Sequence, residues 1–243
     1  MLLVVVLVAL LLEAQGQFEL KPLPYDMDAL EPGVDAGTIS VHWGRHHRQY
    51  MDNMNSALTM LQGSGLVLRA SAKTALDTKL EEDLEAVLTM ASTGEEGEET
   101  IAPVLAKLRN NAGGYLNHND YWDSLAPASK GGGVVDLKST LDLAITQQFG
   151  SFDKFQTQFT REGMQVFGSG WVFLTYHDRK LQVETTENQQ RPVGRVILAC
   201  DLWEHAYYLK RHNKRLEYLA AYFSLVDMSR ANHRYEQLLE CEL

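Results

Sequence analysis

The stretch from Val193 to Tyr208 reads VGRVILACDLWEHAYY, and it combines a strand pattern with a group of polar residues. Its first half is β-branched and apolar, which is typical of a buried strand. That strand ends at Asp201, where a buried carboxylate is costly unless it is paired or bound to a metal. His205 follows four residues later and offers a second ligand. The stretch therefore predicts a strand that leads directly into a metal site.

Two further strands are predicted just before this stretch. The segments WVFLTY at 171–176 and LQVETT at 181–186 are rich in β-branched and aromatic residues, and the four residues between them form a hairpin turn. Ser151 is the expected N-cap of a preceding helix. The predicted helices of this half cover 136–149, 151–167, about 205–226 and 229–239. We therefore expect an α+β domain in which helices surround a three-stranded antiparallel sheet.

The N-terminal half shows only helical patterns after an irregular, proline-rich arm at 18–37. Apolar residues recur at helical spacing over 40–61, over about 73–90 and over 101–122. We expect the last of these helices to be interrupted at Gly113 and Gly114, because glycine weakens a helix. This half is therefore expected to be a helical hairpin domain.

A boundary between the two halves is predicted at the run PASKGGG. Three consecutive glycines can neither hold a helix nor pack as a strand. We expect a signal peptide at 1–16, an N-terminal arm and α-hairpin domain at 17–126, a linker at 127–133 and a C-terminal domain at 134–243.

The chain is acidic, with a formal net charge of -10 and an isoelectric point near 5.3. Binding to nucleic acid or to an anionic membrane requires clustered Lys and Arg, so no nucleic-acid partner is expected. A small, diffusible substrate fits this composition better.

The first 16 residues, MLLVVVLVALLLEAQG, contain an apolar run from Leu2 to Leu12. This run is typical of a secretory signal peptide, and it is shorter than the roughly 20 residues that a membrane span needs. We therefore expect a secreted, extracellular protein with no membrane anchor.

The chain has two cysteines. Cys200 is expected to be a buried small hydrophobic residue. Cys241 lies in the tail, and the sequence leaves open whether it forms a disulfide with a second chain.

Several motifs are spread along the chain. Asp-x-Trp-Glu-His-Ala-Tyr-Tyr is present at 201–208, His-x-x-x-His-His-x-x-Tyr at 42–50, and Asn-His-x-x-(Phe/Tyr)-Trp at 117–122. Shorter motifs are LPYDMDALEP at 23–32, LRNNAGG at 108–114 and FGSGW at 167–171. Together these motifs resemble those of iron/manganese superoxide dismutases, and the resemblance extends over nearly all of the chain after the leader.

The resemblance implies an enzyme that converts superoxide to dioxygen and hydrogen peroxide by redox cycling of a bound manganese ion, with iron as the alternative metal. The implied ligands are His42, His118, Asp201 and His205, with a fifth position for water or hydroxide. Such a donor set suits a first-row metal of intermediate hardness. Zinc could bind to it but has no second oxidation state for the cycle.

The resemblance also implies roles for residues around the metal. Gln189 would hydrogen-bond the metal-bound solvent, Tyr50 would link this glutamine to the substrate channel, and His46 would stand at the gateway beside it. Gln189 and the glycine at Gly114, where iron-type members usually carry the glutamine, both favour manganese. The pocket walls would be Trp122, Trp171 and Trp203.

A second subunit is implied by two residues near the end of the ligand motif. Glu204 would reach a metal-ligating histidine of the partner, and Tyr208 would contact the partner's gateway histidine. We therefore expect a homodimer, with a tetramer left open.

Because superoxide is an anion and the chain is acidic, a local group of basic residues is expected to guide superoxide to the site. The candidates for this group are Lys210, Arg211, Lys214 and Arg215.

Two other hypotheses compete with the enzyme. A non-catalytic extracellular metal-binding protein that retains the fold is the main alternative. The complete ligand set together with Tyr50 and Gln189 argues against it. A non-haem iron oxygenase with two His and one carboxylate is disfavoured by the additional His ligand.

Overall fold

The computed structural model describes residues 18–63 and 102–241. These residues fall into two compact units. One unit contains 18–20, 47–63 and 102–116, and the other contains 21–46 and 117–241. The signal peptide predicted at 1–16 and the helix predicted at about 73–90 lie outside the described residues. Among the described helices, each is too short or too polar to cross a bilayer.

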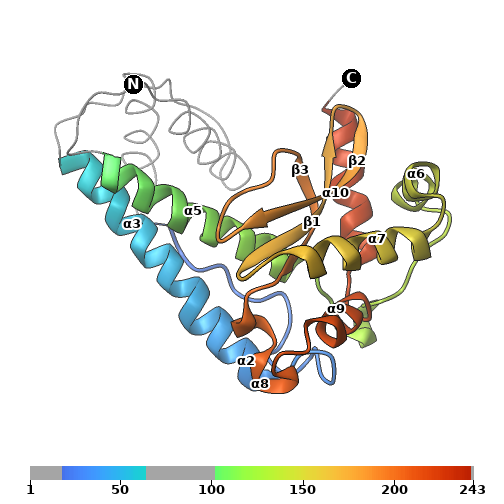
Figure 1. Ribbon diagram of the computed structural model, residues 1–243, viewed down its shortest axis with the longest axis horizontal. Helices are drawn as coiled ribbons and strands as arrows, with labels where there is room; N and C mark the ends of the chain where they lie inside the picture. The colour runs from blue at the N-terminus through green and yellow to red at the C-terminus, as the bar shows by residue number, and fades with distance from the viewer. Residues whose placement is uncertain (1–17, 64–101, 242–243) are drawn as a thin grey trace. The chain divides into compact units, whose positions relative to one another are not determined.

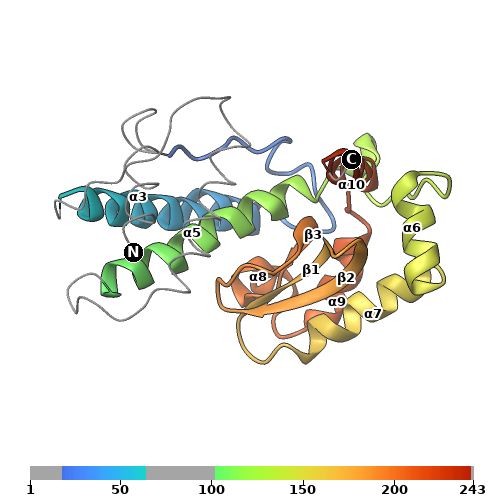
Figure 2. The ribbon, with the colours of Figure 1, turned by 90° about the horizontal axis from the view of Figure 1, so that it is seen from above.

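The first unit is a helical hairpin, as predicted. Its arms are α3 (Arg48–Gly63) and the first part of α5 (Ala102–Asp123), which lie side by side in Figures 1 and 2. The Asn53 amide donates to Asn111 Oδ1 between the two helices at 3.1 Å. Buried apolar residues at helical spacing give each arm an apolar face, namely Met51, Met54 and Leu58 on α3 and Leu108 and Ala112 on α5.

The helix predicted at 40–61 is a run of three helical segments. α2 (Ala36–Val41) is followed by a π-helical turn (His42–His47) and then by α3. The run begins earlier than predicted because Asp35 caps α2, its carboxylate accepting from the Thr38 N–H at 2.8 Å. Single π turns are frequent at functional sites, and this one contains three of the chain's histidines.

The interruption predicted at Gly113 and Gly114 is wrong, because α5 passes through both glycines without a break. At Gly114 the reason for glycine is a close approach to another side chain. A Cβ atom built there would lie 2.5 Å from Cδ1 of Tyr50. Packing in the hairpin, rather than a break in the helix, therefore accounts for this glycine.

The second unit contains the three-stranded antiparallel sheet that the sequence predicts. Its strands are β1 (Gly170–His177), β2 (Lys180–Glu187) and β3 (Arg195–Asp201), in the order β2-β1-β3. Only Asp178 and Arg179 join β1 to β2, both with positive φ (48° and 60°), as a two-residue hairpin turn requires. The central strand β1 is buried from Gly170 to Tyr176, so nearly the whole strand belongs to the core of this unit.

Helices cover this sheet as expected for an α+β domain. They are α6 (Thr140–Phe149), α7 (Phe152–Gln165), α9 (Arg215–Phe223) and α10 (Met228–Glu240). α7 packs against β1 and β2, and α10 packs against β3 (Figures 1 and 2). Ser151 caps α7 as predicted, with its Oγ accepting from the Lys154 N–H at 3.1 Å. Cys200 is fully buried, as predicted, and Cys241 is exposed.

The single helix predicted over about 205–226 is wrong. The chain instead forms a 3-10 turn (Glu204–Ala206), the short helix α8 (Tyr208–Arg211) and α9. α8 ends because His212 adopts a positive φ of 52°, which a helix cannot continue. The break allows α9 to begin in a new direction after Lys214.

The glycine-rich run at 127–133 begins with a 3-10 turn (Ala128–Lys130) and is tied to a second segment of the same unit. The Ala126 N–H donates to the Leu225 carbonyl at 2.8 Å, and the Gly133 N–H donates to the Val226 carbonyl at 2.9 Å. These bonds hold the run closely against the segment between α9 and α10. The domain boundaries given above stay a prediction.

The Gly114→Ala substitution should destabilise the protein, because the new methyl group would overlap the Tyr50 ring. Overpacking of this kind costs about 1–3 kcal/mol. Thermal unfolding followed by circular dichroism measures the effect. Gly44→Ala is the matched control, since a Cβ there meets nothing within 4 Å. Equal melting temperatures for the two variants would contradict this account of Gly114.

Candidate metal centre

Four side chains from distant parts of the sequence converge in the second unit. They are those of His42, His118, Asp201 and His205, and one nitrogen or oxygen atom from each lies within 4.8 Å of the others. Ligand atoms about 2.1 Å from a shared metal ion lie roughly 3–4 Å apart, so this spacing fits one ion. The first three side chains are fully buried, and that of His205 is 14% exposed. The structure therefore brings together all four predicted ligands.

Each of these side chains is placed by the end or the turn of an element. His42 opens the π-helical turn, His118 lies on α5, and Asp201 is the last residue of β3. His205 lies in the 3-10 turn that follows β3. The local fold after β3 thus supplies two of the four groups.

The two oxygens of Asp201 have separate tasks. Oδ1 accepts a hydrogen bond from the Trp203 N–H at 2.8 Å, which fixes the carboxylate to the turn after β3. Oδ2 faces the three imidazoles, with Nε2 of His42 and Nε2 of His205 both 3.0 Å away and Nε2 of His118 3.7 Å away. One oxygen is therefore an anchor, and the other is available as a ligand.

The protonation states of the cluster suit a cation. Burial lowers the pKa of His42 to about 4, despite its contact with Asp201. Although burial alone would raise the pKa of Asp201, His205 and His42 together hold it well below its usual range. Neutral imidazole and ionised carboxylate are the forms that bind metals. At neutral pH these two groups are therefore already in the forms that bind a metal.

His42 gives the clearest indication that a metal fits this site. Among the described residues, neither of its ring nitrogens makes a hydrogen bond of normal geometry, although both are buried. Apart from its 3.0 Å contact with Asp201 Oδ2, the buried Nε2 has no polar neighbour that satisfies it among the described residues, and a metal ion there would do so. The donor set of three imidazoles and one carboxylate fits a first-row metal.

Cys200 is outside this set of four residues. Burial raises the pKa of its thiol, and the thiol contacts the Tyr218 hydroxyl.

The three predicted tryptophans border this cluster. Trp122 meets His42 edge to face at 4.7 Å between ring centroids, Trp171 meets His118 at 5.1 Å, and Trp203 stacks on His205 at 5.5 Å. Trp122 and Trp171 are buried, whereas Trp203 is half-buried. These rings keep water from three of the imidazoles and lower the local dielectric constant.

Tyr121 was not singled out by the sequence, yet it belongs to the same wall. Its ring centroid is 5.3 Å from that of His42, and its hydroxyl shares a 3.1 Å hydrogen bond with the hydroxyl of Tyr218. Burial raises its pKa well above the usual range, so it stays a neutral phenol. Its position beside Trp122 in the motif was the only available signal.

Two of the three predicted catalytic residues lie beside the cluster. Gln189 is buried, and its Oε1 accepts a hydrogen bond from Trp171 Nε1 at 3.0 Å. The His46 ring stacks on the His205 ring at 4.3 Å, and its pKa is lowered by burial and by His205. The third, Tyr50, belongs to the first unit, where its ring lies against Gly114.

The two predicted interface residues are exposed at the surface of the second unit. Glu204 follows Trp203 in the 3-10 turn, and Tyr208 is 48% exposed with its ring 5.9 Å from that of His212. Both therefore lie where a second molecule could reach them.

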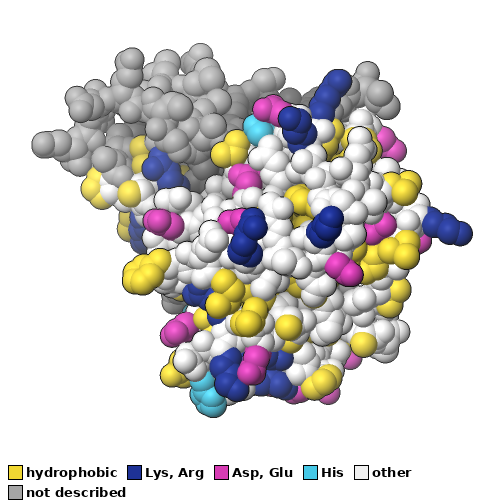
Figure 3. Space-filling view, turned by 45° about the vertical axis from the view of Figure 1, so that its right-hand side comes forward, with side chains coloured by type: hydrophobic (Ala, Val, Ile, Leu, Met, Phe, Trp, Pro, Cys, Tyr) yellow, Lys and Arg dark blue, Asp and Glu magenta, His cyan; other side chains and the backbone are white. Residues whose placement is uncertain are grey.

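The basic residues proposed to guide an anion lie where α8 joins α9. Figure 3 shows Lys and Arg side chains gathered beside a His at the lower edge of the surface. Lys210 pairs with Glu31 at 3.1 Å and Lys214 with Glu217 at 2.9 Å, so both charges are partly compensated. Arg215 donates to the carbonyls of Val166, Gly168 and Leu202 at 2.6–3.1 Å. Arg215 is therefore also a structural residue that ties the segment after α7 and the turn after β3 to α9.

Comparison with known proteins finds matches to both halves of the chain. The family model described as "Iron/manganese superoxide dismutases, alpha-hairpin domain" matches residues 17–126, and the model for the C-terminal domain of the same family matches 137–234. A protein of Acinetobacter baylyi named superoxide dismutase [Mn] is 33% identical over 94% of this chain and 92% of its own length. Superoxide dismutase [Mn] 1 of Leptolyngbya boryana is 38% identical over 90% of this chain and 81% of its own.

The metal-free protein should lose stability as the pH falls from about 6.5 to about 4. In that interval His42 takes up a proton in the unfolded chain but not in the folded one, so lower pH favours unfolding. The decrease in the free energy of unfolding that is attributable to His42 reaches about 3 kcal/mol, which corresponds to the shift of its pKa.

Urea unfolding of the wild type and of His42→Gln at several pH values measures this loss. The wild type should lose stability relative to the variant, which has no titrating group at position 42. A difference between the two proteins that does not change with pH would refute this account of His42.

Proposed function

Since the chain belongs to the iron/manganese superoxide dismutase family, we propose that it converts two superoxide ions and two protons to dioxygen and hydrogen peroxide with a bound manganese ion. The observation that carries the proposal is the buried set of three imidazoles and one carboxylate, with Gln189 and His46 beside it. When bound, the metal supplies two oxidation states, so that one superoxide is oxidised and the next is reduced.

The residues around the metal site have distinct roles. His42, His118, Asp201 and His205 would hold the metal. The surrounding aromatic rings exclude bulk water, which strengthens the electrostatic interactions of the site. His46 covers one face of His205 and is half-buried, which suits a residue at the entry to the site.

The orientation of the Gln189 amide supports its role as a donor. The indole N–H of Trp171 can only donate, so the atom of Gln189 that faces it must be the carbonyl oxygen. The amide nitrogen then faces away from the Trp171 indole, in an orientation in which it can donate. Hydrogen bonds from such a residue to metal-bound solvent tune the reduction potential. We therefore propose Gln189 as the tuning residue.

Manganese is proposed over iron for two reasons. Both relatives described above carry manganese in their names. In addition, no side chain fits at Gly114 without displacing Tyr50, so position 114 cannot supply the glutamine that iron-type members carry there. In this chain the amide would come from Gln189 instead.

Removal and restoration of the metal tests the proposal. Purified protein should contain manganese by elemental analysis, lose superoxide dismutation after chelation, and regain it with manganese more fully than with iron. A protein that binds metal but has no turnover would support the non-catalytic alternative. A protein that holds only zinc would contradict the redox cycle.

Asp201→Asn should lose the metal and at least about 100-fold in activity, because even partners outside the ligand set cost about 10–100-fold. His177→Asn is the matched control. His177 lies 3.4 Å from the Asp178 carboxylate but is 41% exposed and far along β1 from the ligand motif. Comparable losses of metal and activity in the two variants would contradict the assignment of Asp201 as a metal ligand.

We also propose a homodimer, with a tetramer left open, whose interface includes Glu204 and Tyr208. Their exposure beside His205 supports this proposal. Sedimentation should give twice the mass of one chain, and Glu204→Ala should shift the equilibrium toward the monomer and weaken metal retention. Glu217→Ala, which removes an exposed carboxylate paired with Lys214, is the control. A fully active monomer would contradict the dimeric site.

Secretion to an extracellular compartment is proposed from the leader alone. The apolar run from Leu2 to Leu12 precedes the first basic residue, Lys21, which is unlike an Arg-rich organelle leader. N-terminal sequencing of the exported chain tests whether residues near 1–16 are removed.

A further inference from the structure

We infer that Arg191 is a positioning residue for Gln189, because its guanidinium fastens the loop that carries Gln189 to the helix that carries His118. The inference rests on the proposed function, in which the Gln189 amide tunes the metal site. Trp171 holds the end of the Gln189 side chain. Arg191 acts on the backbone from which that side chain extends.

Gln189 lies in the irregular connection between β2 and β3, where the strand ladder no longer supplies hydrogen bonds. Asn188 has a positive φ of 52°, and its N–H donates to the Ser169 carbonyl at 2.9 Å. Its carbonyl accepts from Trp203 Nε1 at 3.0 Å. The residue before Gln189 is therefore tied to the residue that precedes β1 and to the turn that carries His205.

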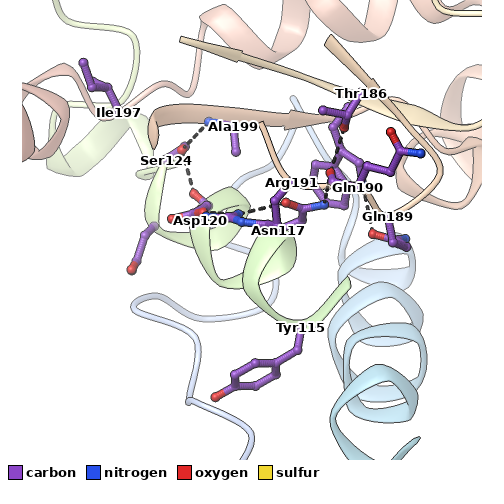
Figure 4. A network of polar contacts seen from close by, with 12 residues as sticks. Tyr115, Asn117, Asp120, Ser124, Thr186, Gln189, Gln190, Arg191, Ile197 and Ala199 are labelled. Atoms are coloured by element: carbon purple, nitrogen blue, oxygen red, sulfur yellow. Dashed lines mark hydrogen bonds and ion pairs between the residues drawn. The ribbon is translucent and has the colours of Figure 1, made fainter. Parts of the chain in front are cut away.

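The residue after Gln189 is held by side chains. The carbonyl of Gln190 accepts from Asn117 Nδ2 at 3.2 Å and from Thr186 Oγ1 at 2.9 Å (Figure 4). Asn117 is fully buried and immediately precedes His118 on α5. The backbone beside Gln189 is thus linked to the backbone beside a proposed metal ligand.

Arg191 decides how Asn117 can make that link. Its Nη1 donates to Asn117 Oδ1 at 2.8 Å and to Asp120 Oδ2 at 2.7 Å, two residues one helical turn apart on α5 (Figure 4). A guanidinium can only donate, so it requires the oxygen of the Asn117 amide to face it. The amide nitrogen must then face the Gln190 carbonyl.

These contacts close a ring. It runs from the Gln190 carbonyl through the backbone to Arg191, along the guanidinium to Asn117, and from the Asn117 amide back to Gln190. The ion pair between Arg191 and Asp120 supports this ring, and because the two side chains are only 15% and 16% exposed it is weakly screened. A ring of this kind fixes the position of the loop relative to α5, and a shift of about 1 Å at such a site can cost 100-fold in rate.

The chain offers a matched control on the same helix. Arg230 on α10 pairs with Asp123 on α5 at 2.6 Å, and within the described part of the chain its hydrogen bonds and ion pairs go to Asp123 and Asp227, not to the loop at 188–191. Its removal deletes an ion pair between an arginine and α5 but leaves the ring intact. A general loss of stability would appear in both variants, whereas a loss of Gln189 positioning would appear only at Arg191.

The test compares Arg191→Met, Arg191→Lys and Arg230→Met with the wild type. In metal-free protein, hydrogen exchange of the backbone at 188–191 should become about tenfold faster in R191M only. In loaded protein, R191M should lose about tenfold in turnover and shift the midpoint potential of the metal, as expected for a change outside the ligand set. R191K keeps the charge and one donor group, so it should recover part of each effect.

Two results would overturn the inference while leaving the proposed function in place. One is R191M behaving as R230M does in exchange, turnover and potential. The other is faster exchange in R191M with an unchanged potential and turnover, which would make Arg191 a structural residue only. If the loaded wild type has no turnover, the proposed function itself fails, and the positioning role falls with it.

Discussion

Asp201 places a carboxylate with no solvent exposure at the end of β3, and an isolated buried charge of this kind is costly. The chain compensates it in two directions. One oxygen accepts from the backbone of the following turn, and the other faces three imidazoles. Those imidazoles come from elements up to 159 residues away, as the His42–Asp201 pair shows. The folding of the second unit therefore brings these elements together around one negative charge.

The surroundings of this charge follow from the same constraint. Aromatic rings pack on the imidazoles, and their low dielectric constant keeps His42 neutral at physiological pH. The same rings include the donor-only indole of Trp171, which orients the Gln189 amide. A wall that protects the cluster thus also positions a polar group beside it. In this way packing and chemistry depend on the same side chains.

Arginines reinforce the irregular segments on which the site is built. Arg215 binds carbonyls in the segment after α7 and in the turn after β3, and Arg191 binds the helix that carries His118. Irregular segments lack the hydrogen bonds of a helix or strand, so their carbonyls need side-chain partners. The sequence suggested that Arg215 guides an anion through its charge. The structure shows that the same guanidinium also makes hydrogen bonds that shape the turn.

The sequence by itself determined the elements whose signals are local. The hairpin of β1 and β2, the N-cap at Ser151 and the strand that ends at Asp201 all follow from patterns within a few residues. The motifs also identified the four side chains that the structure brings together. Tertiary structure alone decided the π turn at His42, the unbroken course of α5 and the break at His212. The physical reason is distance along the chain: Gly114 packs against Tyr50, 64 residues before it, and the partners of Arg191 lie 71 and 74 residues away. A local pattern cannot encode such contacts.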